Sequence, residues 1–88
     1  MSAPVKILIV DDSALIRAHM KKTLAPLEGV EIVGLAPDPF VAREILLRTS
    51  PDLVLLDIEM PRMAGLTFLR KIMRFTPPPP LVISSVTP

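Results

Sequence analysis

Two stretches of the chain decide its fold: VKILIVDDS at residues 5–13 and DLVLLD at residues 52–57. In each stretch a short aliphatic run ends in aspartate. That pattern is typical of a strand that is buried on both faces of a parallel sheet and finishes at a polar edge. We therefore predict strands over residues 5–10 and 52–57.

Helix signals separate these strands. After Ser13, apolar residues recur at helical spacing from Ile16 to Leu24, and Pro26 then breaks the pattern. A helix over this stretch would carry its basic side chains on the opposite, solvent-facing side; they are Arg17, Lys21 and Lys22. A short strand is predicted next, over Glu31–Leu35.

The remaining elements are marked by proline and by capping residues. Asp38 is placed to cap a second helix, which Pro39 would begin and which we predict to run to about Arg48. A third helix is expected from about Leu66 to Arg74, then a stiff connector of four prolines, and then a strand over Leu81–Ser85.

This alternation of strands and helices predicts the architecture. Right-handed crossovers build an α/β fold from it, with a parallel, doubly wound sheet and helices on both faces. In such sheets, ligands bind outside the carboxyl ends of the strands. Here those ends carry Asp11, Asp12, Asp57 and Ser84.

Composition restricts the partners. The chain has 88 residues, the size of one small domain, and a net charge of +1 from ten basic and nine acidic residues spread along it. Neither a nucleic acid nor a membrane is expected as a partner, because there is no sustained basic field and no apolar run near the ~18 residues of a membrane span. The lack of cysteine excludes disulfides, and no secretory signal is recognised, so we expect a cytoplasmic location.

The acidic strand ends suggest a chemistry. If the first and third strands are neighbours, Asp11, Asp12 and Asp57 converge, and their mutual repulsion calls for a cation. Mg²⁺ suits oxygen ligands of this kind. A carboxylate beside Mg²⁺ can attack phosphorus and form an acyl phosphate, so Asp57 is the predicted nucleophile, and the Ser84 hydroxyl could donate a hydrogen bond to the phosphoryl group.

Simpler interpretations stay open for each residue taken alone. Asp11 and Asp12 could merely cap the first helix together with Ser13, and Asp57 could be a solvated loop residue. His19 and Lys21-Lys22 are interpreted as packed or solvated side chains, and Met60, Met63 and Met73 as core filling. A flavin or nucleotide binder of similar layer order is disfavoured, because the first loop lacks a glycine- or hydroxyl-rich phosphate cradle.

Two segments carry a family resemblance. Residues 9–13 (IVDDS) and 55–61 (LLDIEMP) resemble the signature segments of bacterial response-regulator receivers. Residues 34–39 (GLAPDP), 57–63 (DIEMPRM) and 83–87 (ISSVT) further resemble the receivers of chemotaxis protein-glutamate methylesterases. The resemblance implies a flavodoxin-like sheet of strand order 2-1-3-4.

It also implies roles. Asp57 would be the phosphoacceptor, Asp12 and Asp57 would contact Mg²⁺ directly, Asp11 would act through water, and the backbone carbonyl of Glu59 would complete the protein ligands. Ser84 matches the switch hydroxyl of the family. The phosphodonor would be a sensor histidine kinase or a small acyl phosphate. The regulated effector would be a methylesterase domain, which residues 1–88 do not include, so no ester hydrolysis is expected of this chain.

The sequence departs from the family pattern in two ways. Receivers usually continue through a fourth helix, a fifth strand and a fifth helix, so residues 1–88 are expected to form an incomplete receiver. In the family that fifth strand carries a lysine that contacts the phosphoryl group, and none of Lys6, Lys21, Lys22 or Lys71 is expected to replace it. Ala64 stands where the family usually has aspartate.

The first departure leaves an alternative function open. Exposed surfaces on the fourth strand and the first helix lead us to expect a homodimer or a strand-exchanged oligomer. The alternative to phosphoryl signalling is then a degenerate receiver that acts as a dimerising interaction module without phosphoryl turnover.

Overall fold

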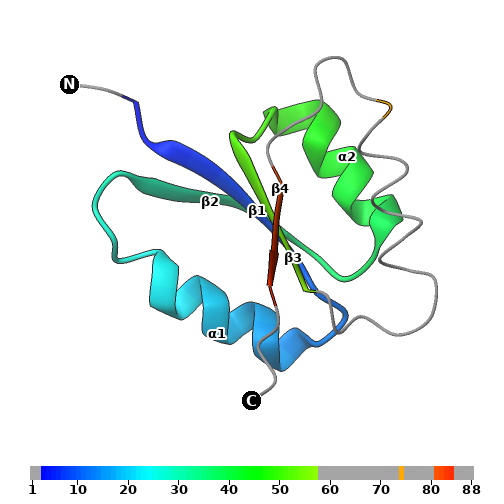
Figure 1. Ribbon diagram of the computed structural model, residues 1–88, viewed down its shortest axis with the longest axis horizontal. Helices are drawn as coiled ribbons and strands as arrows, with labels where there is room; N and C mark the ends of the chain where they lie inside the picture. Colours follow the sequence, from blue (N-terminus) through cyan, green and yellow to red (C-terminus); the bar gives the residue numbers. More distant parts are fainter. Residues whose placement is uncertain (1–2, 58–73, 75–80, 85–88) are drawn as a thin grey trace.

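A computed structural model describes residues 3–57, 74 and 81–84 (Figure 1). Its elements are β1 (Val5–Val10), α1 (Ala14–Leu24), β2 (Val30–Ala36), α2 (Pro39–Thr49), β3 (Leu53–Asp57) and β4 (Leu81–Ser84). Each agrees with a predicted element to within a residue or two at either end. The predicted helix over 66–74 and the proline connector lie outside the described residues, except Arg74, which is in a turn.

The strands form one parallel sheet in the order β2-β1-β3-β4. The helices lie on opposite faces of this sheet (Figure 1), and both pack against β1 and β2. The structure thus confirms the predicted doubly wound fold and the strand order 2-1-3-4. Within the described ranges, no helix has the length and apolar character that crossing a membrane would require.

Local hydrogen bonds define where the helices begin. The Ser13 hydroxyl accepts the Ile16 N–H at 3.2 Å, which makes Ser13 the N-cap of α1. The Asp38 carboxylate accepts the N–H groups of Phe40 and Val41 at 2.9 and 3.0 Å, which confirms the predicted cap of α2. These bonds satisfy backbone donors that have no partner inside the helix.

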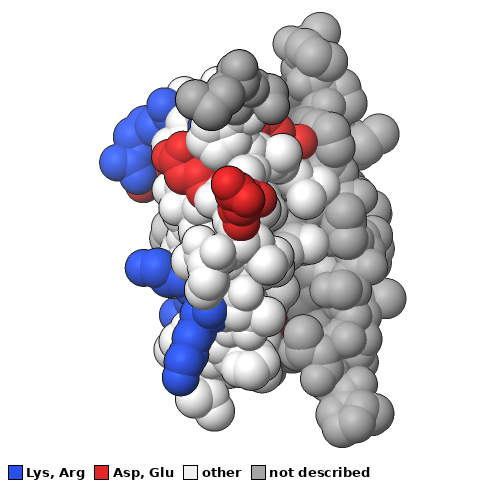
Figure 2. Space-filling model, turned by 90° about the vertical axis from the view of Figure 1, so that its left-hand side faces the viewer, with Lys and Arg blue, Asp and Glu red and all other residues white. Residues whose placement is uncertain are grey.

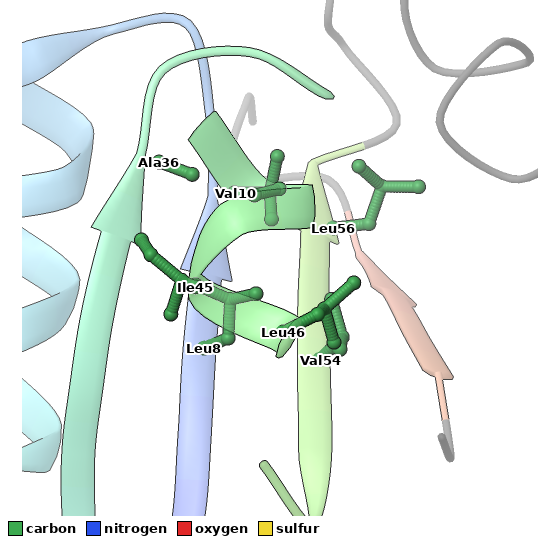
Figure 3. Close-up of a cluster of buried hydrophobic side chains, with 8 residues drawn as sticks. Leu8, Val10, Ala36, Ile45, Leu46, Val54 and Leu56 are labelled. Carbon is green, nitrogen blue, oxygen red and sulfur yellow. The ribbon is translucent and has the colours of Figure 1, made fainter. Parts of the chain in front are cut away.

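The main core lies between the sheet and α2 (Figure 3). Alternate strand residues point into it, as expected from the two-residue period of a strand. Its buried members are Leu8, Val10, Ala36, Ala42, Ile45, Leu46, Val54 and Leu56. Gly34 allows the closest approach, because a Cβ there would lie 2.8 Å from both Cδ1 and Cγ2 of Ile45. In this packing of β2 against α2, a larger residue at position 34 would force the Ile45 side chain to shift.

The other helix, α1, is itself less buried than α2. Ile7 and Ile9 are buried in the sheet, yet α1 has no buried residue of its own, and Leu15 is 79% exposed. Ile16, Met20 and Leu24, the predicted inward side of this helix, are half-buried. Figure 2 shows one side of the molecule, on which basic and acidic side chains both appear. The described residues therefore do not give this side a charge of a single sign.

Candidate functional site

The carboxyl edge of the sheet, where the strands end, brings the predicted backbone positions together. Val10 pairs with Leu56, and Asp57 pairs with Ser84. Because Asp11 directly follows Val10 and Asp57 directly follows Leu56, the positions of Asp11, Asp57 and Ser84 lie in one row across three neighbouring strands. The expected meeting of the first and third strands is confirmed at the level of the backbone.

Asp11 is held firmly at this edge. It is fully buried, and its N–H donates to the Ala36 carbonyl of β2 at 3.0 Å. Its Oδ1 accepts the Ser13 N–H at 2.8 Å, a local turn that aspartate favours. Its carbonyl accepts a 2.6 Å hydrogen bond from Nη1 of Arg17. Three separate groups therefore fix the end of β1.

Asp12 is in a different environment. Its carboxylate is exposed, and among the described residues it accepts no hydrogen bond. The simpler interpretation gave this residue a part in capping α1, but the cap is made by the Ser13 hydroxyl. Asp12 thus projects a carboxylate that the local fold does not use, beside the buried carboxylate of Asp11.

The oxygen donors present at this edge are of the type that Mg²⁺ prefers, since it binds one or two carboxylates and keeps several waters. Among the side chains that the structure describes, no three acidic or histidine groups gather closely enough to bind a metal ion. The side chain of Asp57 is not among them, so the three-carboxylate site stays a prediction. Also outside the described part are Glu59, Ala64, Lys71, Ser85, the side chain of Ser84 and the methionines at 60, 63 and 73.

Lys6 is hydrogen-bonded at the opposite, amino edge of the sheet, where the strands begin. Its Nζ donates to the Thr49 carbonyl at 2.7 Å, and its N–H donates to Oδ2 of Asp52 at 2.9 Å. Asp52 N–H in turn donates to the Lys6 carbonyl at 2.8 Å. Lys6 therefore lies at the wrong end of β1 to contact a phosphoryl group on Asp57, as the sequence predicted.

Other side chains on α1 fit their predicted roles, with one exception. His19, Lys21 and Lys22 are exposed, which confirms that they are solvated. Arg17 was placed on the solvent side of the helix, and this was incomplete: it is half-buried, and its guanidinium reaches back to Asp11. The only sequence signal for this contact is the spacing of six residues between the two.

The response regulator receiver domain family matches residues 7–87. The chain belongs to this receiver family. The match spans all six described elements except the first two residues of β1.

Individual relatives show which kind of receiver this chain is most like. A protein-glutamate methylesterase/protein-glutamine glutaminase of Anaeromyxobacter dehalogenans is 52% identical over 84 residues, which are 96% of this chain but 24% of the relative. The chain thus spans about a quarter of the length of that relative. This likeness confirms the resemblance to methylesterase receivers seen in the sequence.

Solved structures of receivers agree with the fold. The response regulator domain of Thermotoga maritima CheB superposes with a TM-score of 0.81 at 33% identity, over 93% of this chain and 60% of that chain. A structure of the P1 domain of CheA3 in complex with CheY6 from R. sphaeroides gives a TM-score of 0.81 at 31% identity, over 98% of this chain and 67% of that chain.

Proposed function

We propose that this receiver accepts a phosphoryl group on Asp57 in a Mg²⁺-dependent reaction and regulates a methylesterase effector in a chemotaxis two-component system of the cytoplasm. The observation that carries the proposal is the strand register, because it aligns the positions of Asp11, Asp57 and Ser84 at one edge. Family membership supports the same role.

In the proposed reaction, a carboxylate oxygen of Asp57 attacks phosphorus and forms a P–O bond. The P–N bond of a donor phosphohistidine breaks, and its electron pair leaves with the imidazole. With a small acyl phosphate as donor, a P–O bond breaks instead and a carboxylate leaves. Asp12, Asp57 and the backbone carbonyl of Glu59 would hold Mg²⁺ directly, and Asp11 would act through water. The cation would offset negative charge on the nucleophile and on the phosphoryl oxygens.

After transfer, the Ser84 hydroxyl would donate a hydrogen bond to the phosphoryl group. Ser84 pairs with Asp57 in the register of β3 and β4, which supports this role. The phosphoryl group, with a charge of about −1.5 to −2, would replace the single negative charge of the Asp57 carboxylate. This change in charge and hydrogen bonding would then bias the chain that follows β4 and any surface it forms.

The relatives support the identity of the partners. Methylesterases are among the most similar proteins, and one similar structure contains the P1 domain of CheA3 with CheY6. We therefore propose a sensor histidine kinase as the phosphodonor and a methylesterase domain as the effector.

Incubation with Mg²⁺ and acetyl phosphate, followed by intact mass measurement, tests the assignment of Asp57. We expect the wild type to gain the mass of one phosphoryl group and Asp57→Asn to gain none. Asp52→Asn is the matched control, because it makes the same chemical change near the other end of β3 and keeps an oxygen that can accept the Lys6 N–H. Equal phosphorylation of wild type and Asp57→Asn would reject the proposal.

The second candidate function is an interaction module that self-associates without phosphoryl turnover. Two observations favour it: the apolar side chain of Leu15 is exposed on α1, and Lys6 is hydrogen-bonded at the amino edge, away from Asp57. This function predicts a dimer by native mass spectrometry at micromolar concentration and no mass gain with acetyl phosphate. A phosphorylated monomer would exclude it.

A further inference from the structure

Arg17 makes a contact across the start of α1. Its position is in the first turn of the helix, which begins at Ala14, and its Nη1 donates to the Asp11 carbonyl at 2.6 Å. Hydrogen bonds from a charged donor are shorter and roughly twice as strong as neutral ones. This bond is partly buried, so water competes with it less than at an open surface.

The contact completes a set of restraints around Asp12. On one side, Asp11 is bonded through its N–H to β2 and through its carbonyl to Arg17. On the other side, Ser13 is bonded through its N–H to Asp11 Oδ1 and through its hydroxyl to the Ile16 N–H. Asp12 lies between these two fixed residues, so its carboxylate is presented from a backbone with little freedom to rotate.

We propose that Arg17 is a positioning residue for the metal site: its bond to the Asp11 carbonyl holds the loop so that Asp12 is preorganised to bind a divalent cation. The inference rests on the proposed function and deepens it. Restraint of a ligand by neighbouring hydrogen bonds strengthens metal binding, and loss of such a restraint typically weakens affinity about 10–100-fold.

Electrostatics alone predicts the opposite sign. A guanidinium bonded to the Asp11 carbonyl would repel a cation held at the proposed site, so removal of its charge would tighten Mg²⁺ binding if Arg17 acted only as a charge. The direction of the change in affinity therefore separates positioning from simple charge.

The test is Mg²⁺ titration by calorimetry on wild type, Arg17→Met and Lys21→Met. Lys21 is the matched control, because it lies on the same helix, is exposed, and loses the same charge in the same substitution. We expect about 10–100-fold weaker binding for Arg17→Met and wild-type affinity or slightly tighter binding for Lys21→Met. Arg17→Lys keeps the charge but loses the planar fork, and should bind with intermediate affinity.

Hydrogen exchange at the Ser13 amide adds a readout that needs no metal. We expect faster exchange in metal-free Arg17→Met than in Lys21→Met, because the loop that shields this N–H is released. If Arg17→Met does not fold, Arg17→Lys carries both measurements with the same expected direction.

Equal or tighter Mg²⁺ binding by the Arg17 variants would overturn the proposal, as would unchanged exchange at Ser13. Failure of the proposed function gives a different pattern. In that case wild type itself would bind no Mg²⁺ and accept no phosphoryl group, so Arg17 would have no metal site to position, whatever the exchange at Ser13.

Discussion

The amino and carboxyl edges of the sheet both carry charged residues, but these residues are hydrogen-bonded differently at the two edges. At the amino edge, Lys6 and Asp52 are bonded to each other's backbone, and Lys6 Nζ also binds Thr49. At the carboxyl edge, Asp11 is fixed by three bonds, while the neighbouring carboxylate of Asp12 is left exposed. The comparison shows that polar groups are hydrogen-bonded to the backbone at one edge, whereas at the other edge the Asp12 carboxylate accepts no hydrogen bond from the described residues.

The largest effect is expected at Asp12. Asp12→Asn removes a proposed direct ligand of Mg²⁺. Loss of a group that only hydrogen-bonds to a ligand weakens metal affinity roughly 10–100-fold, so this substitution should weaken it more. Stability should change little, because no hydrogen bond of the described structure depends on this side chain. Calorimetric titration and thermal unfolding of the same sample measure both. Unchanged affinity would show that the carboxyl edge is no more specialised than the amino edge.

Gly34 in the body of the sheet tests whether Mg²⁺ affinity simply follows stability. In Gly34→Ala the new Cβ would meet two carbons of Ile45, and overpacking of a core typically costs about 1–3 kcal/mol of unfolding free energy. Urea unfolding should show this loss while the folded protein keeps wild-type Mg²⁺ affinity.

A double-mutant cycle with Ile45→Ala locates the cause of that loss. Once the Ile45 side chain is shortened, adding the Cβ at Gly34 should cost little more. A full penalty in the Ile45→Ala background would refute the steric explanation.

The smallest effect is expected at the amino edge. Lys6→Met keeps the aliphatic stem and loses the bond to the Thr49 carbonyl, so unfolding free energy should fall by about 1 kcal/mol. Phosphorylation by acetyl phosphate should proceed as in wild type. Loss of phosphorylation in this variant would mean that Lys6 serves the site after all, and the contrast between the edges would fail.

The sequence predicted the elements well because its local signals are strong. The aliphatic runs of β1 and β3, the Asp38 cap and the breaks after α1 each act over a few residues and suffice to place an element. The convergence of Asp11 with the end of β3 followed from two such runs and the strand order. These are the features that also carry the family resemblance.

Contacts between distant residues could not be predicted in this way. The Lys6 bonds to Thr49 and Asp52 join residues 43 and 46 positions apart. The approach of Gly34 to Ile45 and the register shift between Ile7 and Leu8 in the pairing of β1 with β2 are likewise not encoded by a local pattern. Arg17 looked like a solvent-facing helix residue, because helical spacing gives no sign that a side chain bends back to the preceding loop.

The most direct test of the account uses Mn²⁺ as a paramagnetic substitute for Mg²⁺ in backbone NMR spectra. If the carboxyl edge binds the cation, the amide signals of Asp11, Asp12, Ser13, Asp57 and Ser84 should broaden selectively at low Mn²⁺, and excess Mg²⁺ should restore them. The amides of Lys6 and Asp52 at the amino edge should stay sharp. Equal broadening at both edges, or none at the carboxyl edge, would contradict the account.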